Sequence, residues 1–284
     1  MDDYRDLGLK DFFDGTAREF IKNRILDSDA GLSEDGYDMF GTSLRTITDA
    51  STILLFLYKN YFRVEADGFE NLPENGPGLI VANHAPILPF DASMIFMAAL
   101  LEPEKPRFVR TIINKSISTI PFASTLILRG GQVIGCDENV RQVFKNQNLI
   151  VVFPTGAEGD VHTIFNKYHL DRFTVGFMEY ALKFNTPIIP TVVLGSEEAA
   201  MTLGKIDLNF LGFKHLPLTP IFPWLGLAGL IPFPSKFRIH FSEPVDYFTE
   251  NSEKVGEPVV VRHLVDDLHG RIRTLLDEKL DSQF

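Results

Sequence analysis

From residue 78 onward, short apolar runs alternate with segments whose apolar residues recur at helical spacing. The short runs are rich in Ile, Val or Phe, which is typical of buried strands. They cover residues 78–83, 107–113, 149–153, 187–194 and 237–242. Helix candidates lie between or after them, at residues 91–101, 138–146, 172–185 and 261–280. This alternation predicts an α/β fold with a mixed, largely parallel sheet that is flanked by helices.

The N-terminal part of the chain has a different pattern. Residues 1–45 mix acidic and apolar side chains and are interrupted by several glycines, which predicts short helices and turns. Residues 47–62 have the pattern of one apolar helix, whose uncharged stretch is shorter than the roughly 20 residues that a membrane-spanning helix needs. We therefore expect an N-terminal helical arm over residues 1–62 and an α/β domain over residues 63–284, packed either as two units or as one continuous domain.

The composition narrows the class of protein. A chain of 284 residues with 45% hydrophobic side chains can bury a sizeable core. Its net charge of -11 argues against a nucleic acid partner, because binding to phosphates needs an excess of Lys and Arg. The single cysteine, Cys136, excludes an internal disulfide, and the acidic start of the chain does not resemble a signal peptide. We therefore expect a cytoplasmic protein.

The segment from Asn83 to Asp91 carries the residues best suited to catalysis. A strand candidate ends just before His84, and Asp91 opens the next apolar helix. An imidazole is a natural general base near neutral pH, and a carboxylate on its other ring nitrogen fixes the tautomer and stabilises the imidazolium. From these residues alone a second interpretation stays open, in which Asp91 only caps the helix and His84 is a buried, hydrogen-bonded residue.

Other patterns of catalytic or ligand-binding residues are weak. The chain contains no G-x-S-x-G elbow, no H-E-x-x-H or C-x-x-C spacing, and no glycine-rich loop for phosphates or dinucleotides. Cys136 is followed by an acidic residue, which does not favour a thiolate. We therefore predict general-base catalysis without a covalent intermediate, a metal site or a bound cofactor.

Four blocks along the chain resemble the motifs of the glycerolipid acyltransferase family, in particular its bacterial lysophospholipid acyltransferase-like members. The first block is Asn83-His84 with Asp91, and the third is Phe153-Pro154-Thr155-Gly156, which is similar to F-P-E-G. The second lies at residues 128–135, and the fourth, a strand with an internal proline, lies at residues 186–193. The order and spacing of all four agree with the family, and the resemblance extends over residues 45–245.

The resemblance implies acyl transfer from a thioester, either acyl-CoA or acyl-carrier protein, to a hydroxyl of a lysophospholipid or related glycerolipid. It also implies that His84 is the general base and that Asp91 holds the imidazole. The thioester is a co-substrate, so no separate cofactor is expected. The expected substrate-binding residues are Asn83, Arg129, Gly130, Phe153, Pro154, Thr155, Gly156 and Glu158.

The chain departs from the family pattern at three places. Six residues separate His84 from Asp91, where the family usually has four. Thr155 stands where the family usually has a glutamate that helps to place a phosphorylated acceptor, and the second block lacks the later arginine often used for phosphate. Two alternatives therefore stay open: a catalytically inactive lipid-binding module on the same scaffold, and an acyltransferase for a neutral, non-phosphorylated alcohol.

Residues 216–235 contain no charged side chain and five prolines, which preclude a regular membrane-spanning helix. This stretch is either a buried irregular segment or a surface loop that enters one leaflet of a membrane. Its candidate membrane contacts are Trp224, Leu225, Leu227 and Leu230, and the apolar helix at 47–62 is a second candidate. Because a lipid acceptor lies in a bilayer, we expect peripheral association with the inner face of the cytoplasmic membrane.

Overall fold

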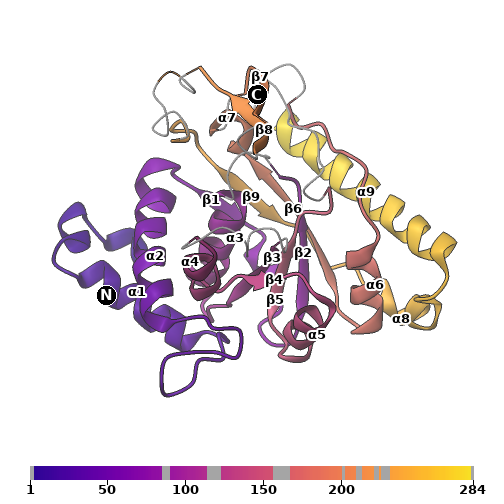
Figure 1. Cartoon of the computed structure of the whole chain (residues 1–284), viewed down its shortest axis with the longest axis horizontal. Helices are drawn as coiled ribbons and strands as arrows, with labels where there is room; N and C mark the ends of the chain where they lie inside the picture. The colour runs from indigo at the N-terminus through magenta and orange to yellow at the C-terminus, as the bar shows by residue number, and fades with distance from the viewer. Residues whose placement is uncertain are drawn as a thin grey trace.

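The structure is a computed structural model. Its largest element is a seven-stranded sheet with the strand order β1-β9-β6-β2-β5-β3-β4 (Figure 1). The described residues are 3–84, 90–113, 123–155, 167–199, 202–208, 213–220, 224 and 231–282. The strands of this sheet are β1 (Glu65–Asp67), β2 (Gly78–Ala82), β3 (Val109–Ile113), β4 (Val133–Ile134), β5 (Leu149–Val152), β6 (Ile188–Leu194) and β9 (Arg238–Phe241). A separate antiparallel hairpin is formed by β7 (Gly204–Leu208) and β8 (Phe213–Leu218).

Five adjacent strands of the large sheet run in the same direction. β2 pairs in parallel with β5 on one side and with β6 on the other, and β3 pairs in parallel with β5 and β4. β9 is antiparallel to β6, and β1 is parallel to β9, so these two strands run the opposite way. The predicted mixed, largely parallel sheet is confirmed, and β2, β3, β5, β6 and β9 are the five predicted strands.

Helices cover both faces of the sheet. The α-helices are α1 (Thr16–Asp27), α2 (Leu44–Phe56), α3 (Phe90–Leu101), α4 (Ala123–Arg129), α5 (Asp137–Lys145), α6 (Gly176–Lys183), α7 (Ser196–Ala199), α8 (Phe248–Asn251) and α9 (Pro258–Asp281). Shorter turns are η1 (Tyr4–Asp6), η2 (Leu9–Phe12), the π-helical η3 (Leu57–Tyr61), η4 (Phe69–Asn71) and η8 (Ser252–Lys254). Within the described part of the chain, every helix is too short or too polar to cross a bilayer.

The predicted helices are present with shifted ends. The apolar helix expected at 47–62 begins earlier, because Ser43 caps α2 by accepting a hydrogen bond from the backbone N–H of Thr46. Its last part, from Leu57 to Tyr61, continues as the π-helical turn η3. The last helix begins at Pro258, and proline is favoured in the first turn of a helix because its missing N–H would have no partner there.

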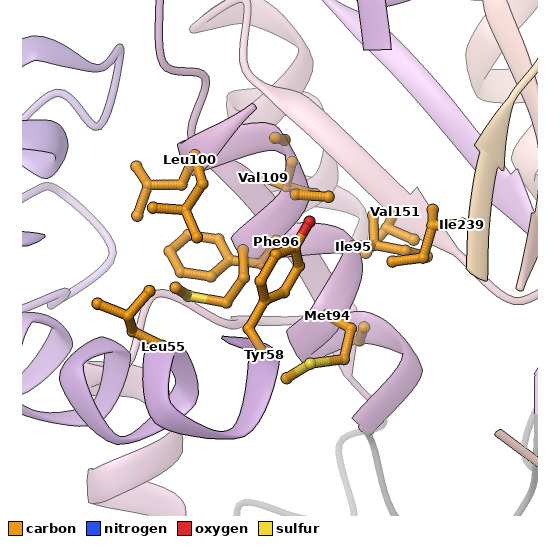
Figure 2. Close-up of a cluster of buried hydrophobic side chains, with 14 of the residues drawn as sticks. Leu55, Tyr58, Met94, Ile95, Phe96, Leu100, Val109, Val151 and Ile239 are labelled. Atoms are coloured by element: carbon orange, nitrogen blue, oxygen red, sulfur yellow. The ribbon is translucent and has the colours of Figure 1, made fainter. Parts of the chain in front are cut away.

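The core consists of two apolar layers separated by the sheet. The side chains of β2 alternate between them: Ile80 and Ala82 face the layer with α1, α2 and α3, whereas Leu79 and Val81 face the layer with α5, α6 and α9. α3 is apolar on all sides and lies between α2 and the sheet, where Figure 2 shows Met94 among the other buried side chains. The start of α3, which carries Asp91, is therefore held by packing on several sides.

A buried arginine connects the N-terminal arm to the sheet. The guanidinium of Arg110 in β3 lies 2.6 Å from the carboxylate of Asp38, and both side chains are buried. Its remaining N–H groups donate to Thr42 Oγ1, the backbone oxygens of Ala30 and Gly131, and Asn148 Oδ1. A buried charge is tolerated only when it is paired and hydrogen-bonded in this way.

We predict that Asp38→Ala lowers the free energy of unfolding by about 3 to 5 kcal/mol, because it leaves the Arg110 charge buried without its partner. Urea denaturation measures this change. The matched control is Asp49→Ala, which removes the exposed partner of Arg18 and should cost less than about 1 kcal/mol. Equal effects of the two substitutions would contradict the prediction.

Candidate active site

His84 and Asp91 form a hydrogen-bonded pair at the carboxyl end of β2. His84 Nδ1 lies 2.8 Å from Asp91 Oδ2, so the structure brings together the two residues that the sequence predicts as a base and its carboxylate. The Asp91 side chain is 1% exposed, whereas that of His84 is 25% exposed. A carboxylate only accepts hydrogen bonds, so it places the proton of a neutral imidazole on Nδ1 and leaves Nε2 as the basic nitrogen.

The first turn of α3 favours the carboxylate of Asp91. The positive end of the helix dipole lies at this turn, where an anionic side chain is stabilised. Phe90, the preceding residue, packs its ring edge-on against Phe62 with the ring centroids 5.4 Å apart. Phe62 is fully buried and also contacts the ring of Phe237 at 4.5 Å. The end of η3 and the start of β9 thus hold the turn that carries Asp91.

Asn83 joins the end of β2 to the neighbouring strand β6. Its Nδ2 donates to the backbone oxygen of Val193 at 2.9 Å, and the backbone N–H of Val193 donates to its Oδ1 at 2.8 Å. The side chain therefore continues the pairing of the two strands beyond Ala82, and it fixes the position of the next residue, His84. The expected contact of Asn83 with a substrate stays a prediction.

The third sequence block lies beside His84 because β5 is paired with β2 in parallel. The ring of Phe153 lies 4.5 Å from the His84 ring, centroid to centroid, at an angle of 33°. The backbone oxygen of Pro154 accepts two hydrogen bonds from Thr174, one from its N–H and one from its hydroxyl, each 2.9 Å long. Phe153, Pro154 and Thr155 therefore follow β5 at the same sheet edge as His84. Gly156 and Glu158 lie outside the described residues.

Arg129 and Gly130 precede an edge strand of the sheet. Arg129 ends α4, its side chain is exposed, and its backbone oxygen accepts the N–H of Ser43 at 3.0 Å. The chain then enters β4, the edge strand that is separated from β2 by β5 and β3. Three strand spacings correspond to about 14 Å. Among the described residues the structure records no contact of Arg129 or Gly130 with His84, and their contact with an acceptor stays a prediction.

A polar cluster that sequence reasoning missed follows β6. The Tyr168 hydroxyl donates to Glu198 Oε2 at 2.5 Å and accepts the backbone N–H of Gly195 at 2.7 Å. The backbone N–H of Tyr168 donates to Glu197 Oε2 at 2.7 Å, and Lys167 Nζ lies 3.2 Å from Glu198 Oε1. Burial, together with the charge of Glu198, raises the pKa of Tyr168, so this phenol keeps its proton. The available sequence signal was a pair of glutamates that follows a buried strand after two intervening residues.

The predicted membrane-contact residues are described only in part. The Trp224 side chain is 79% exposed, and Leu225, Leu227 and Leu230 lie outside the described residues. Ile231 is also exposed, and the next residue, Pro232, accepts a hydrogen bond from the Tyr61 hydroxyl at 2.6 Å. The described end of the apolar, proline-rich segment thus contacts the end of η3.

Comparison with known proteins identifies relatives of this chain. A family model described as "Acyltransferase" matches residues 63–194. Uncharacterized proteins of Mycobacterium tuberculosis and Mycobacterium leprae are both 33% identical over 261 residues, which is 90% of this chain and 71% and 70% of theirs. A human protein named "DGAT1/2-independent enzyme synthesizing storage lipids" is 26% identical over 73% of this chain and 62% of its own.

A solved structure also resembles the chain. The 1-acyl-sn-glycerophosphate acyltransferase PlsC from Thermotoga maritima aligns with a TM-score of 0.44 at 18% sequence identity, covering 92% of this chain and 96% of PlsC.

We predict that Asn83→Ala destabilises the protein by about 2 kcal/mol, because it leaves the buried N–H and C=O of Val193 without partners. The change is measured by urea denaturation, and faster hydrogen exchange of the Val193 amide would locate it. Asn75→Ala is the control, since Asn75 is exposed and its side chain accepts a hydrogen bond from the side chain of Lys105. An unchanged exchange rate at Val193 would refute the positioning role.

Proposed function

The chain belongs to the acyltransferase family, and we propose that it moves a fatty acyl group from a thioester to a hydroxyl of a lysophospholipid or related glycerolipid. The donor is acyl-CoA or acyl-carrier protein. The observation that carries the proposal is the 2.8 Å contact between His84 Nδ1 and the buried Asp91 carboxylate. The imidazole of His84 itself is partly exposed. This geometry supplies a general base for an alcohol.

In the proposed mechanism, Asp91 keeps the proton on His84 Nδ1, so that Nε2 accepts the proton of the acceptor hydroxyl. The hydroxyl oxygen attacks the thioester carbonyl, and the tetrahedral intermediate collapses as the carbon–sulfur bond breaks. The imidazolium then returns its proton to the leaving thiolate, and no acyl-enzyme forms. General-base catalysis contributes about 10² to 10⁴ in rate, and the rest comes from holding the two substrates together.

A neutral alcohol is the second candidate acceptor. Thr155 stands where the family uses a glutamate to place a phosphorylated acceptor, and β4, the strand that follows Arg129, is the edge strand three positions from β2. The relatives from human, chicken and cattle carry a name that refers to the synthesis of storage lipids, which favours a non-phosphorylated acceptor. A purely lipid-binding module is less well supported, because such a module does not need an oriented His84–Asp91 pair.

The same proposal places the protein on the inner face of the cytoplasmic membrane. Contact with a membrane surface is supported by the exposed Trp224, with the exposed Ile231 a few residues later and Tyr61 of η3 hydrogen-bonded to Pro232. A Trp at the surface of an uncharged segment suits the interface between headgroups and acyl chains.

We predict that His84→Ala lowers acyl transfer by at least about 10²-fold, because the general base is lost, and that Asp91→Asn lowers it by a similar order. The assay follows labelled acyl-CoA, or acyl-carrier protein, with lysophospholipids, monoacylglycerol and diacylglycerol as acceptors. His263→Ala is the matched control, since His263 is exposed on α9. Near-normal turnover of the His84 variant would disprove the mechanism, and no transfer to any acceptor would favour the lipid-binding module.

We predict that Trp224→Ser combined with Ile231→Ser reduces binding to liposomes at least about tenfold, because each apolar side chain contributes roughly 1.5 to 3 kcal/mol when buried in lipid. Flotation of the protein with phospholipid vesicles measures the bound fraction. Val259→Ser is the control, since Val259 is an exposed apolar residue at the start of α9. Unchanged flotation of the double variant would exclude this segment as a membrane contact.

A further inference from the structure

A pocket of about 310 Å³ lies at the side of the sheet formed by β6, β9 and the edge strand β1, next to the last turn of α9. Its lining combines apolar side chains of the strands with five charged or titratable groups: Glu65, Asp67, Arg238, His240 and Lys279. Sites for small molecules commonly have volumes of about 300 to 1,000 Å³, with a few polar groups on an apolar surface. The pocket therefore has the size and the lining of a small-molecule site.

The pairing of the strands brings the basic groups of this pocket together. Arg238 and His240 of β9 lie directly opposite Leu194 and Val192 of β6. Residues that are opposite each other in a sheet share one face, and both β6 residues belong to the apolar layer with α9. Arg238 and His240 therefore point to the α9 face, where Lys279 in the last turn of α9 also lines the pocket. α3 packs on the other face of the sheet.

The carboxylates of the pocket are its most exposed charged groups. The side chains of Glu65 and Asp67 are 59% and 67% exposed, because both lie on the edge strand β1. By contrast, the side chains of His240 and Lys279 are 24% and 31% exposed. The inner part of the pocket is therefore basic, and the acidic groups lie at its rim.

The basic groups keep donors that the protein itself does not use. Arg238 contacts Glu65 only through Nε, at 3.4 Å, and its two terminal nitrogens have no hydrogen-bond partner among the described residues. Lys279 Nζ lies 3.7 Å from Asp67 Oδ2, which is longer than a hydrogen bond. His240 faces Asp67 through Nδ1, which leaves Nε2 for another partner. A bound molecule can therefore use all three side chains.

The charges of the pocket favour an anionic ligand. Three cations, Lys236, Arg238 and Lys279, surround the two carboxylates of Glu65 and Asp67, so positive charge is in excess even with a neutral imidazole. The chain as a whole has a net charge of -11, so this local excess is opposite in sign to the rest of the protein. A phosphate group offers several acceptor oxygens, which suit an arginine fork and a lysine ammonium at the same time.

We propose that this pocket is a second ligand site, which binds the phosphate group of a phosphate monoester through Arg238, Lys279 and His240. The site uses none of the residues of the His84–Asp91 pair and does not depend on the proposed acyl transfer. A phosphate bound there joins the last turn of α9 to β9, so that the ligand stabilises this side of the sheet.

Isothermal titration calorimetry of the full chain tests the site, with glycerol 2-phosphate as the probe and glycerol as its uncharged reference. We expect saturable binding of glycerol 2-phosphate, at least about tenfold tighter than that of glycerol. Arg238→Gln and Lys279→Gln should each weaken it about tenfold, because each removes a charged donor. The matched control is Arg273→Gln, which removes an exposed arginine of α9 that is paired with Asp277 and lies outside the pocket.

Two further titrations distinguish the source of the phosphate. Inorganic phosphate replaces the ester in the calorimeter, and flotation compares phosphatidylcholine vesicles with and without phosphatidate, whose headgroup is a phosphate monoester. The site is supported by whichever of the three phosphate probes depends on Arg238 and Lys279, and that probe identifies the source as a soluble ester, free phosphate or a lipid headgroup.

The inference and the proposed function fail separately. His84→Ala should bind the phosphate probe as the unmodified protein does, although it loses acyl transfer. Equal affinities of the unmodified protein and the Arg238 and Lys279 variants for every phosphate probe would overturn the second site, and so would an equal loss of binding in His84→Ala. Loss of the site in the two pocket variants with normal acyl transfer is the expected result.

Discussion

The parallel pairing of β2 with β5 and β6 is the constraint on which the whole site depends. Because neighbouring parallel strands end at one edge, segments far apart in the chain meet there. The amide of Asn83 extends this pairing past the last backbone bridge by binding both backbone groups of Val193. His84 therefore leaves the sheet from a fixed point, and the carboxylate of Asp91 reaches it from a helix that is buried on all sides.

Much of the fold could be predicted from local patterns, and the exceptions have physical reasons. The predicted strands β2 and β6 are buried along their whole length, whereas β1 and β4 have three and two residues and are too short to form a pattern. The sequence pattern starts the helix before β6 at residue 172, but α6 begins at Gly176. Thr174 lies in the intervening segment, where its N–H and hydroxyl both donate to the backbone oxygen of Pro154.

Only those residues of the site that lie close together in the sequence could be predicted to be in contact. His84 and Asp91 lie within one strand–loop–helix unit, so their spacing already indicated a pair. The contact between Tyr168 and Glu198 spans 30 residues and follows no periodic pattern. The contact of Arg129 with an acceptor stays a prediction: the order of the blocks along the chain suggested it, and β4, the strand that follows Arg129, is the edge strand of the sheet. Strand order is determined by tertiary packing and cannot be predicted from any one segment.

The burial of Arg110 also has a consequence for how the chain reaches its folded state. The residues that bind its guanidinium come from the N-terminal arm, from the turn before β4 and from the residue before β5. The Arg110 guanidinium cannot be desolvated until all three segments have assembled around it, because an unpaired buried charge is strongly unfavourable. We therefore expect the arm and the sheet to form in a single cooperative step, so that proteolytic removal of the arm would unfold the catalytic part as well.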